Sequence, residues 1–251
     1  MTVLEVSGLT KHFGGITAVN DCSFTIPRGT IVGLIGPNGA GKTTVFNMIT
    51  GFLRPDAGSI RFDGVDITTL RPDQIFTLGI SRTFQSIRLF PKMTVLENAL
   101  LAGKAQRELL HHAVLQLPSW KREREHQLAC VRETLALVGL SDKAGELAGN
   151  VSYGQQKLLE IARALISEPE LVLLDEPAAG VNPTMLKQIT ALLQKLKEQG
   201  KTILLVEHDM EFVMGICDIL IVLDYGKEIA VGTPMEIRKN PRVLEAYLGV
   251  T

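Results

Sequence analysis

The chain has few cysteines and almost no net charge, and both features exclude classes of function. Its 251 residues include three cysteines, Cys22, Cys130 and Cys217, which are far apart. Neither a disulfide framework nor a cysteine metal site is predicted, and a reducing compartment is favoured. The formal net charge is -1, from 26 basic and 27 acidic residues. This balance gives no electrostatic argument for a nucleic-acid partner or an acidic lipid surface.

Long hydrophobic runs are also missing from the sequence. No apolar stretch approaches the roughly twenty residues that a helix needs to cross a bilayer. Residues 1–5 carry neither a basic segment nor a long apolar core, so they do not predict a signal peptide. We find no internal repeat and no low-complexity segment. Any role at a membrane is therefore expected to be peripheral, through a partner.

Residues 36–44 carry a phosphate-binding pattern. They read Gly-Pro-Asn-Gly-Ala-Gly-Lys-Thr-Thr, which fits Gly, four residues, Gly-Lys-Ser/Thr. The apolar run 31–35 before the pattern predicts a buried strand, and 45–49 after it predicts a helix. In that position, backbone N–H groups can converge on one anion, and the helix start adds its positive dipole end. The alternative is a glycine-rich turn that matches by chance.

The pattern predicts a site for the phosphates of a nucleotide with Mg²⁺; that the nucleotide is ATP is implied only by the family resemblance described below. Lys42 is expected to reach the β- and γ-phosphates, and the Thr43 hydroxyl to hold the metal ion. The predicted nucleotide-binding residues of this loop are Gly36, Pro37, Asn38, Gly39, Ala40, Gly41, Lys42, Thr43 and Thr44.

A second segment, 171–177, is an apolar run that ends in two acids. Ligand sites in parallel sheets lie at the carboxyl ends of the strands. Asp175 is expected to hold the magnesium shell, as in other P-loop NTPases. Glu176 is expected to orient the attacking water or accept its proton. The alternative is a strand end that faces solvent.

The remaining pattern predicts an α/β fold. The apolar runs 31–35, 171–174 and 203–206 suit parallel strands covered on both faces, and 185–199 predicts a helix between two of them. Segments 4–6, 23–26 and 59–62 predict short strands of an antiparallel layer. The charged, helical stretch of about 94–140 interrupts the α/β pattern and predicts an inserted helical subdomain. Its run Lys121-Arg122-Glu123-Arg124-Glu125 suits a solvated helix face.

Residues 151–156, Val-Ser-Tyr-Gly-Gln-Gln, precede a helical run over 157–166. Ser152 suits a helix N-cap, which is a purely structural reading. The segment also resembles the signature motif of ABC-type ATPases, usually Leu-Ser-Gly-Gly-Gln, and stands about twenty residues before the Asp-Glu strand. The resemblance implies that Ser152, Gly154 and Gln155 contact nucleotide.

Further motifs of that family follow in order along the chain. Gln85, in Arg-Thr-Phe-Gln, resembles the Q-loop glutamine, which implies a contact with magnesium. His208, in Val-Glu-His-Asp, resembles the H-loop histidine, and Phe13 the aromatic that stacks on adenine. The resemblance implies a catalytic set of Glu176, His208, Gln85 and Lys42, and a metal set of Thr43, Gln85 and Asp175. Taken alone, each has a structural alternative: surface glutamine, strand-end histidine, core phenylalanine.

The similarity covers the whole chain and resembles most the ATPase subunits of bacterial branched-chain amino acid importers. The segments that carry it are 81–85, 89–90, 93–98, 153–156, 207–210 and the tail 225–249. Tyr153 replaces the first signature glycine, and Asn182 stands where aspartate is usual. The resemblance implies a P-loop NTPase (ABC ATPase) core with an antiparallel β layer, in a single ATP-binding domain, 1–251. It implies a helical subdomain over about 86–160 and a short C-terminal extension over about 225–251.

This resemblance also implies that the protein hydrolyses ATP to power the uptake of branched-chain or other apolar amino acids, and it implies which partners the protein has. The expected partners are a second ATPase copy (the same chain or a related subunit), two transmembrane permease subunits and, indirectly, a solute-binding protein. The expected place is the cytoplasmic face of the inner membrane. Cassettes for urea, amides or lipopolysaccharide stay open, as does a soluble ABC ATPase, although the chain has neither tandem cassettes nor long coiled-coil insertions. No Asn/Thr-Lys-x-Asp segment supports a GTPase.

Overall fold

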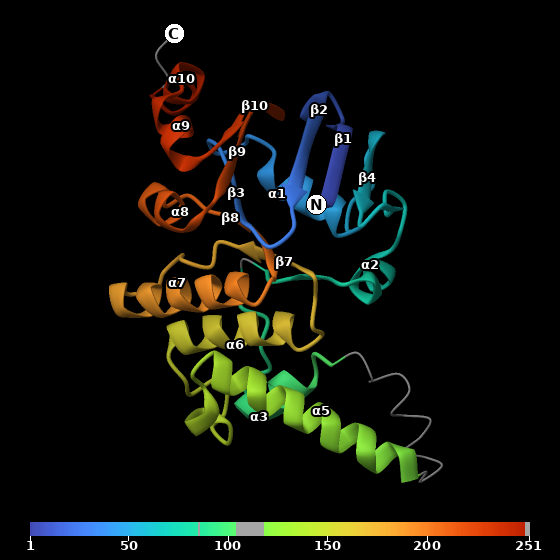
Figure 1. Ribbon diagram of the computed structural model, residues 1–251, viewed down its shortest axis with the longest axis vertical. Coiled ribbons are helices and arrows are strands. Elements are labelled where there is room, and N and C mark those ends of the chain that lie inside the picture. Colours follow the sequence, from blue (N-terminus) through green and yellow to red (C-terminus); the bar gives the residue numbers. More distant parts are fainter. Residues whose placement is uncertain (85, 104–117, 249–251) are drawn as a thin grey trace. The chain divides into compact units, whose positions relative to one another are not determined.

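The computed structural model describes residues 1–84, 86–103 and 118–248 (Figure 1). The chain divides into two compact units. The first comprises Met1–Arg82, Glu170–Ala179 and Leu193–Thr251, and the second comprises Thr83–Pro169 and Gly180–Leu192. The P-loop and the Asp-Glu strand therefore belong to the first unit, and the signature segment belongs to the second.

The first unit contains a six-stranded sheet in the order β10-β9-β3-β8-β7-β6. All neighbouring pairs are parallel except β10 with β9, which is antiparallel. The strands are β3 (Ile31–Ile35), β6 (Ile80–Arg82), β7 (Leu171–Asp175), β8 (Thr202–Val206), β9 (Ile219–Asp224) and β10 (Lys227–Gly232).

The three apolar runs of the sequence are the centre of this sheet. Every residue of β3, β7 and β8 is buried, as expected of parallel strands covered on both faces. The sequence prediction did not include β6, β9 or β10. Parallel pairing puts the ends of β3, β7 and β8 at one edge of the sheet.

The predicted antiparallel layer is confirmed, with longer strands than expected. Its order is β2-β1-β4-β5, and its strands are β1 (Thr2–Phe13), β2 (Ile16–Pro27), β4 (Ala57–Phe62) and β5 (Val65–Asp66). The pairing of β1 with β2 shifts register at several points, including between Val6 and Leu9. Such irregularities interrupt the strict alternation of apolar and polar residues, which explains why the pattern predicted only fragments of these strands.

The helices of the first unit are α1 (Lys42–Ile49), α2 (Pro72–Leu78), α8 (Met210–Ile216), α9 (Pro234–Lys239) and α10 (Pro241–Leu248). One buried cluster joins α1 to both sheets: Phe46 of α1 lies in it with Ile60 of β4 and Leu34 of β3. Helix α1 starts at Lys42, three residues before the predicted start at residue 45 and directly after Gly41, the last glycine of the P-loop. Its position in the core fixes the loop that precedes it.

The second unit is helical among its described residues. It contains α3 (Val95–Leu100), α5 (Pro118–Leu137), a 3₁₀ helix (Ser141–Lys143) and α6 (Tyr153–Leu165), and α7 (Pro183–Glu198) begins in it. Helix α6 starts at residue 153 rather than the predicted 157, because Ser152 caps it. Part of the predicted helical stretch 94–140 lies outside the described residues. None of the helices in the described ranges combines the length and hydropathy that crossing a bilayer requires.

Candidate functional site

The P-loop connects β3 to α1, and two of its positions admit only glycine. Gly36 has a φ of +150°, and a Cβ there would lie 2.1 Å from the carbonyl oxygen of Leu223. Gly41 has a φ of +98°, and a Cβ there would lie 2.5 Å from the carbonyl oxygen of Ala18. Any side chain would collide with backbone at both places. The two glycines of the phosphate-binding pattern are thus required by the shape of the loop.

Lys42 is the first residue of α1, and its side chain is buried against the loop. Its Nζ donates hydrogen bonds to the carbonyl oxygens of Gly36, at 2.8 Å, and Pro37, at 2.9 Å. Burial lowers the pKa of Lys42, and the negative charge of Glu176 opposes that shift. The ammonium group therefore lies at the loop and within the electrostatic reach of the Asp-Glu strand. Thr43, the next residue, is exposed, and Thr44 is half-buried.

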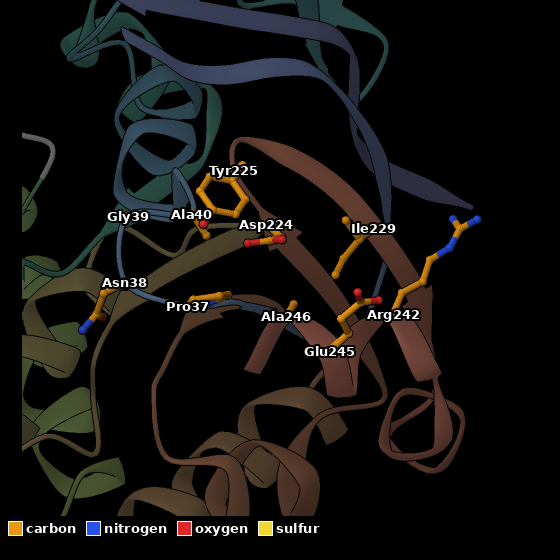
Figure 2. Close-up of a pocket in the computed structure, with 10 residues that line it drawn as sticks. All are labelled: Pro37, Asn38, Gly39, Ala40, Asp224, Tyr225, Ile229, Arg242, Glu245 and Ala246. Carbon is orange, nitrogen blue, oxygen red and sulfur yellow. The ribbon is translucent and has the colours of Figure 1, made fainter. Parts of the chain in front are cut away.

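The other face of the P-loop borders a pocket of about 500 Å³ (Figure 2). The residues that line it are Pro37, Asn38, Gly39 and Ala40 of the loop, Asp224, Tyr225 and Ile229 near the β9–β10 turn, and Arg242, Glu245 and Ala246 of α10. Figure 2 shows the Arg242 guanidinium directed away from the other labelled side chains. Burial raises the pKa of Tyr247, in α10, to about 12, and the nearby backbone of Gly36 opposes that rise. The C-terminal helix is therefore a neighbour of the P-loop.

Asp175, at the end of β7, forms a buried ion pair that the sequence prediction missed. Its Oδ2 lies 2.8 Å from a terminal nitrogen of Arg82, and both side chains are less than one tenth exposed. The other terminal nitrogen of Arg82 donates to Oδ1 of Asn47, in α1, at 2.6 Å. Arg82 thus links the Asp-Glu strand to the helix that follows the P-loop. The only signal in the sequence was its position three residues before Gln85.

Glu176 and His208 form the second pair at this edge of the sheet. Nε2 of His208 lies 3.0 Å from Oε1 of Glu176. A carboxylate only accepts, so Nε2 must carry the hydrogen of this contact. Glu176 has a φ of +50°, which is rare for a residue with a side chain. Its backbone N–H donates to the carbonyl oxygen of Val206 at 2.9 Å, which holds it in that conformation.

Glu207 supports this pair, and the sequence prediction gave it no role. Its Oε1 accepts from the backbone N–H of Ala178 at 2.6 Å, and its Oε2 from the N–H of His208 at 3.1 Å. Burial raises the pKa of Glu207, and these backbone hydrogen bonds oppose the rise. One buried carboxylate therefore fixes both the turn after Glu176 and the residue His208. An acid directly after an apolar run was the available signal.

Phe13 and Gln85 were predicted to contact the adenine and the magnesium ion, and the structure describes only the first of them. Phe13 ends β1 with its ring about half exposed, and the Nζ of Lys11 lies 5.8 Å from the ring centroid. An exposed aromatic face is what stacking on a base requires. Gln85 lies outside the described residues.

The signature segment lies in the second unit, at the start of α6. Ser152 Oγ accepts from the N–H of Gln155 at 3.3 Å, and Gln155 Oε1 accepts from the N–H of Ser152 at 2.9 Å. This capping box is the structural role foreseen for Ser152. It leaves the first backbone N–H groups of the helix, those of Tyr153 and Gly154, for an anion. A Cβ at Gly154 would lie 2.6 Å from Cγ of Met185, so a larger residue here would have to displace that side chain.

The donor set at the P-loop fits magnesium. The exposed hydroxyl of Thr43 and the carboxylate of Asp175 are both oxygen ligands, which this ion prefers. Among the described residues, no group of three or more His, Cys, Asp or Glu side chains could hold a metal ion. Magnesium usually keeps several waters and binds through one or two protein ligands plus substrate phosphates. These residues suit a metal ion shared with a nucleotide rather than one enclosed by protein.

Sequence comparison finds relatives over the whole chain. The family model described as ABC transporter matches residues 19–179, and the model described as branched-chain amino acid ATP-binding cassette transporter matches residues 227–251. The high-affinity branched-chain amino acid transport ATP-binding protein BraF of Pseudomonas aeruginosa is 45% identical over 249 residues, or 98% of each chain. The protein LivG of Salmonella typhimurium, which has the same description, is 46% identical over the same extent.

Solved structures agree with these relatives. The ADP conformation of an ATP-binding cassette from an ABC transporter is 34% identical, covers 100% of both chains and has a TM-score of 0.87. A dimeric ATP-binding cassette in a post-hydrolysis state, bound to ADP and Pi, is 27% identical, with a TM-score of 0.74. That match covers 92% of this chain and 98% of the other.

Proposed function

We propose a function from one premise: the chain belongs to the ABC transporter family and, within it, to the ATP-binding proteins of branched-chain amino acid transport. As an ATPase of that family, it powers the uptake of branched-chain or other apolar amino acids. The observation that carries the hydrolytic part is the Glu176–His208 pair at 3.0 Å, in the same unit as the P-loop. The full-length similarity to two branched-chain amino acid transport proteins supports the cargo.

The residues of the first unit divide the chemistry between binding and proton transfer. Lys42 and the backbone N–H groups of the P-loop bind the β- and γ-phosphates, and Phe13 stacks on the adenine. Thr43 and Asp175 would hold magnesium, together with Gln85, which lies outside the described residues. When bound, magnesium would supply positive charge to the phosphates. Glu176 orients the attacking water and accepts its proton, while His208 fixes the orientation of that carboxylate.

A second copy of an ATPase subunit completes the site. Ser152, Gly154 and Gln155 of that copy present the start of α6 to the γ-phosphate, where backbone N–H groups and the helix dipole favour negative charge. ATP then favours the closed dimer because it binds that state more tightly. A dimeric cassette bound to ADP and Pi among the similar structures supports this arrangement.

The segment 87–96 suits a contact with the permease subunits. Phe90 is 52% exposed, Met93 is half-buried, and Arg88 and Lys92 are exposed. Apolar anchors with a charged rim fit a short helix from a membrane protein. The proposed complex has two transmembrane subunits, receives solute from a binding protein and holds this chain at the cytoplasmic face of the inner membrane. We propose that the chain acts as a single ATP-binding domain, 1–251. It has a helical subdomain at about 86–160 and a short C-terminal extension at about 225–251.

Reconstitution tests the proposed function directly. The subunit is expressed with its membrane partners and placed in lipid vesicles, and ATP-dependent uptake of leucine is compared with uptake of urea. We expect leucine uptake in the parent complex and none with Glu176→Gln. Uptake of urea alone would overturn the cargo and leave the ATPase assignment intact.

A second experiment tests the partner surface. Phe90→Asp should keep basal ATPase activity but weaken recovery of the membrane subunits from detergent extracts. Met235→Asp, at an apolar position that is 73% exposed elsewhere on the chain, is the matched control and should assemble normally. Full assembly of Phe90→Asp would remove this surface from the interface.

A further inference from the structure

One residue of the segment 87–96, Arg88, is held by α6 through both its backbone N–H and its backbone carbonyl. The backbone N–H of Arg88 donates to Oε1 of Glu160 at 2.7 Å. The carbonyl oxygen of Arg88 accepts from a terminal nitrogen of Arg163 at 2.6 Å. Glu160 and Arg163 are three residues apart, so they project from the same face of the helix. All three residues belong to the second unit.

Glu160 is buried and Arg163 is half-buried, in a way that stability alone does not favour. Glu160 is 6% exposed, and burial raises the pKa of Glu160 although Lys157, Arg163 and Arg88 oppose the rise. Its other oxygen, Oε2, and the Nε of Arg163 are buried without a hydrogen-bond partner in the part of the chain that the structure describes. An apolar pair would avoid these unpaired polar atoms. What the two charged side chains add is two strong, directional bonds to the backbone of one residue, Arg88.

We propose that Glu160 and Arg163 form a clamp that makes residues 86–94 move together with the signature segment. Helix α6 carries the signature residues Ser152 to Gln155 at its start and the clamp two to three turns later. A rigid helix that holds the backbone of Arg88 through two charge-assisted bonds passes its own displacement to the segment around that residue. The clamp rests on the proposed function, because it joins the γ-phosphate contact to the surface proposed for the permease.

The side chain of Arg88 makes a contact separate from the clamp, which provides a matched control. Its guanidinium carbon lies 3.9 Å from the centroid of the Phe84 ring. Arg88→Ala removes that contact but keeps the backbone N–H and carbonyl that the clamp holds. Glu160→Met and Arg163→Met remove one bond each at similar side-chain length, and Glu160→Gln keeps an accepting oxygen.

The first experiment follows hydrogen–deuterium exchange of the purified subunit over a series of ATP concentrations, with Glu176→Gln present in every variant to slow turnover. Peptides covering 86–94 and 152–156 should gain protection with the same ATP dependence in the parent. In Glu160→Met and Arg163→Met, protection at 86–94 should be lost while that at 152–156 remains. Arg88→Ala and Glu160→Gln should behave like the parent. Protection at 86–94 that survives in both Met variants would overturn the clamp.

If neither Met variant folds, the exchange data of the parent protein still test the clamp, because separate ATP dependences for the two peptides would contradict a rigid link.

The second experiment measures ATPase activity in the assembled transporter without the Glu176→Gln change. Stimulation by leucine and binding protein should fall at least about fivefold in the Met variants, the lower end of typical coupling effects. Basal activity should stay near that of the parent. The exchange results do not depend on the cargo, so failure of leucine transport would leave the test of the clamp intact.

Discussion

Nε2 of His208 lies 3.0 Å from Oε1 of Glu176, and Glu207, the neighbour of His208, holds the turn that follows Glu176 through the N–H of Ala178. The residues that follow β7 and β8 are therefore joined by two side-chain contacts. One contact involves the proposed catalytic carboxylate of Glu176 itself, and the other holds the turn directly after it. This fixes the orientation of Glu176 more tightly than the backbone alone.

Glu176→Gln should stop turnover without preventing ATP binding. The amide keeps the size of the side chain but cannot accept the proton of water, and a general base typically contributes 10²–10⁴-fold. We expect ATPase activity to fall by about 100-fold or more. Size-exclusion chromatography with ATP and magnesium should show a trapped dimer. A variant with parental turnover would remove Glu176 from the role of base.

Lys42→Met should abolish ATP binding without destabilising the fold. The ammonium group is buried and its pKa is lowered by burial, so the fold gains little from the charge. We expect loss of ATP binding, measured by nucleotide fluorescence, with no decrease in the free energy of unfolding in urea. Parental affinity for ATP would contradict the phosphate role of Lys42.

Arg82→Met should destabilise the fold because it leaves Asp175 charged and buried. Removing one partner of a buried pair typically costs about 3–5 kcal/mol. The double variant Arg82→Met with Asp175→Asn should regain part of this loss, since no unpaired charge remains. Urea denaturation of the parent, the two single variants and the double variant measures the coupling. Additive effects in that cycle would contradict a direct ion pair.

Glu207 should make the stability of the first unit depend on pH. Burial raises the pKa of Glu207 above its ordinary value of 4.5. Between pH 4.5 and the raised pKa, the folded state therefore binds more protons than the unfolded state. Stability contributed by Glu207 is therefore present at low pH and falls as pH rises from 4.5 through the raised pKa. Glu207→Gln should lose less stability than the parent over this window, measured by urea denaturation at each pH. Parallel curves would show that Glu207 titrates normally.

Complementation should reveal a site made from two copies. Ser152→Arg blocks the signature side, and Lys42→Ala blocks the P-loop side. A mixed dimer of these variants contains one intact site, so its ATPase activity should exceed that of either variant alone. Mixed dimers are isolated by two affinity tags, with the parent mixed in the same way as the control. No gain in proven mixed dimers would argue against the shared site.

The sequence predicts best the features that depend on local pattern. Continuous apolar runs identified β3, β7 and β8, and the glycines of the P-loop pattern stand where backbone leaves no room for a Cβ. Ser152 was foreseen as a cap because capping needs only four residues of sequence. The start of α6 was nevertheless placed four residues late.

The features that the sequence did not predict depend on pairing between distant segments. Arg82 meets Asp175 only because the three-residue β6 lies parallel to β7, with Arg82 opposite Leu173. A strand that short has no periodicity to detect. Glu207 accepts a hydrogen bond from the N–H of Ala178, 29 positions away; the acid after an apolar run marks Glu207 itself but does not identify this partner. Long-range geometry, rather than residue type, assigns these two side chains their positions.

The left-handed backbone of Glu176 has an evolutionary consequence. A non-glycine residue in that conformation costs on the order of 1–3 kcal/mol. Replacement by glycine would relieve the strain and remove the proposed base in the same step. The chain is thus one substitution away from a cassette with a less strained backbone that lacks the proposed base. If Glu176 has the proposed role, selection for hydrolysis keeps glutamate at this position, and descendants freed from that selection are expected to lose it readily.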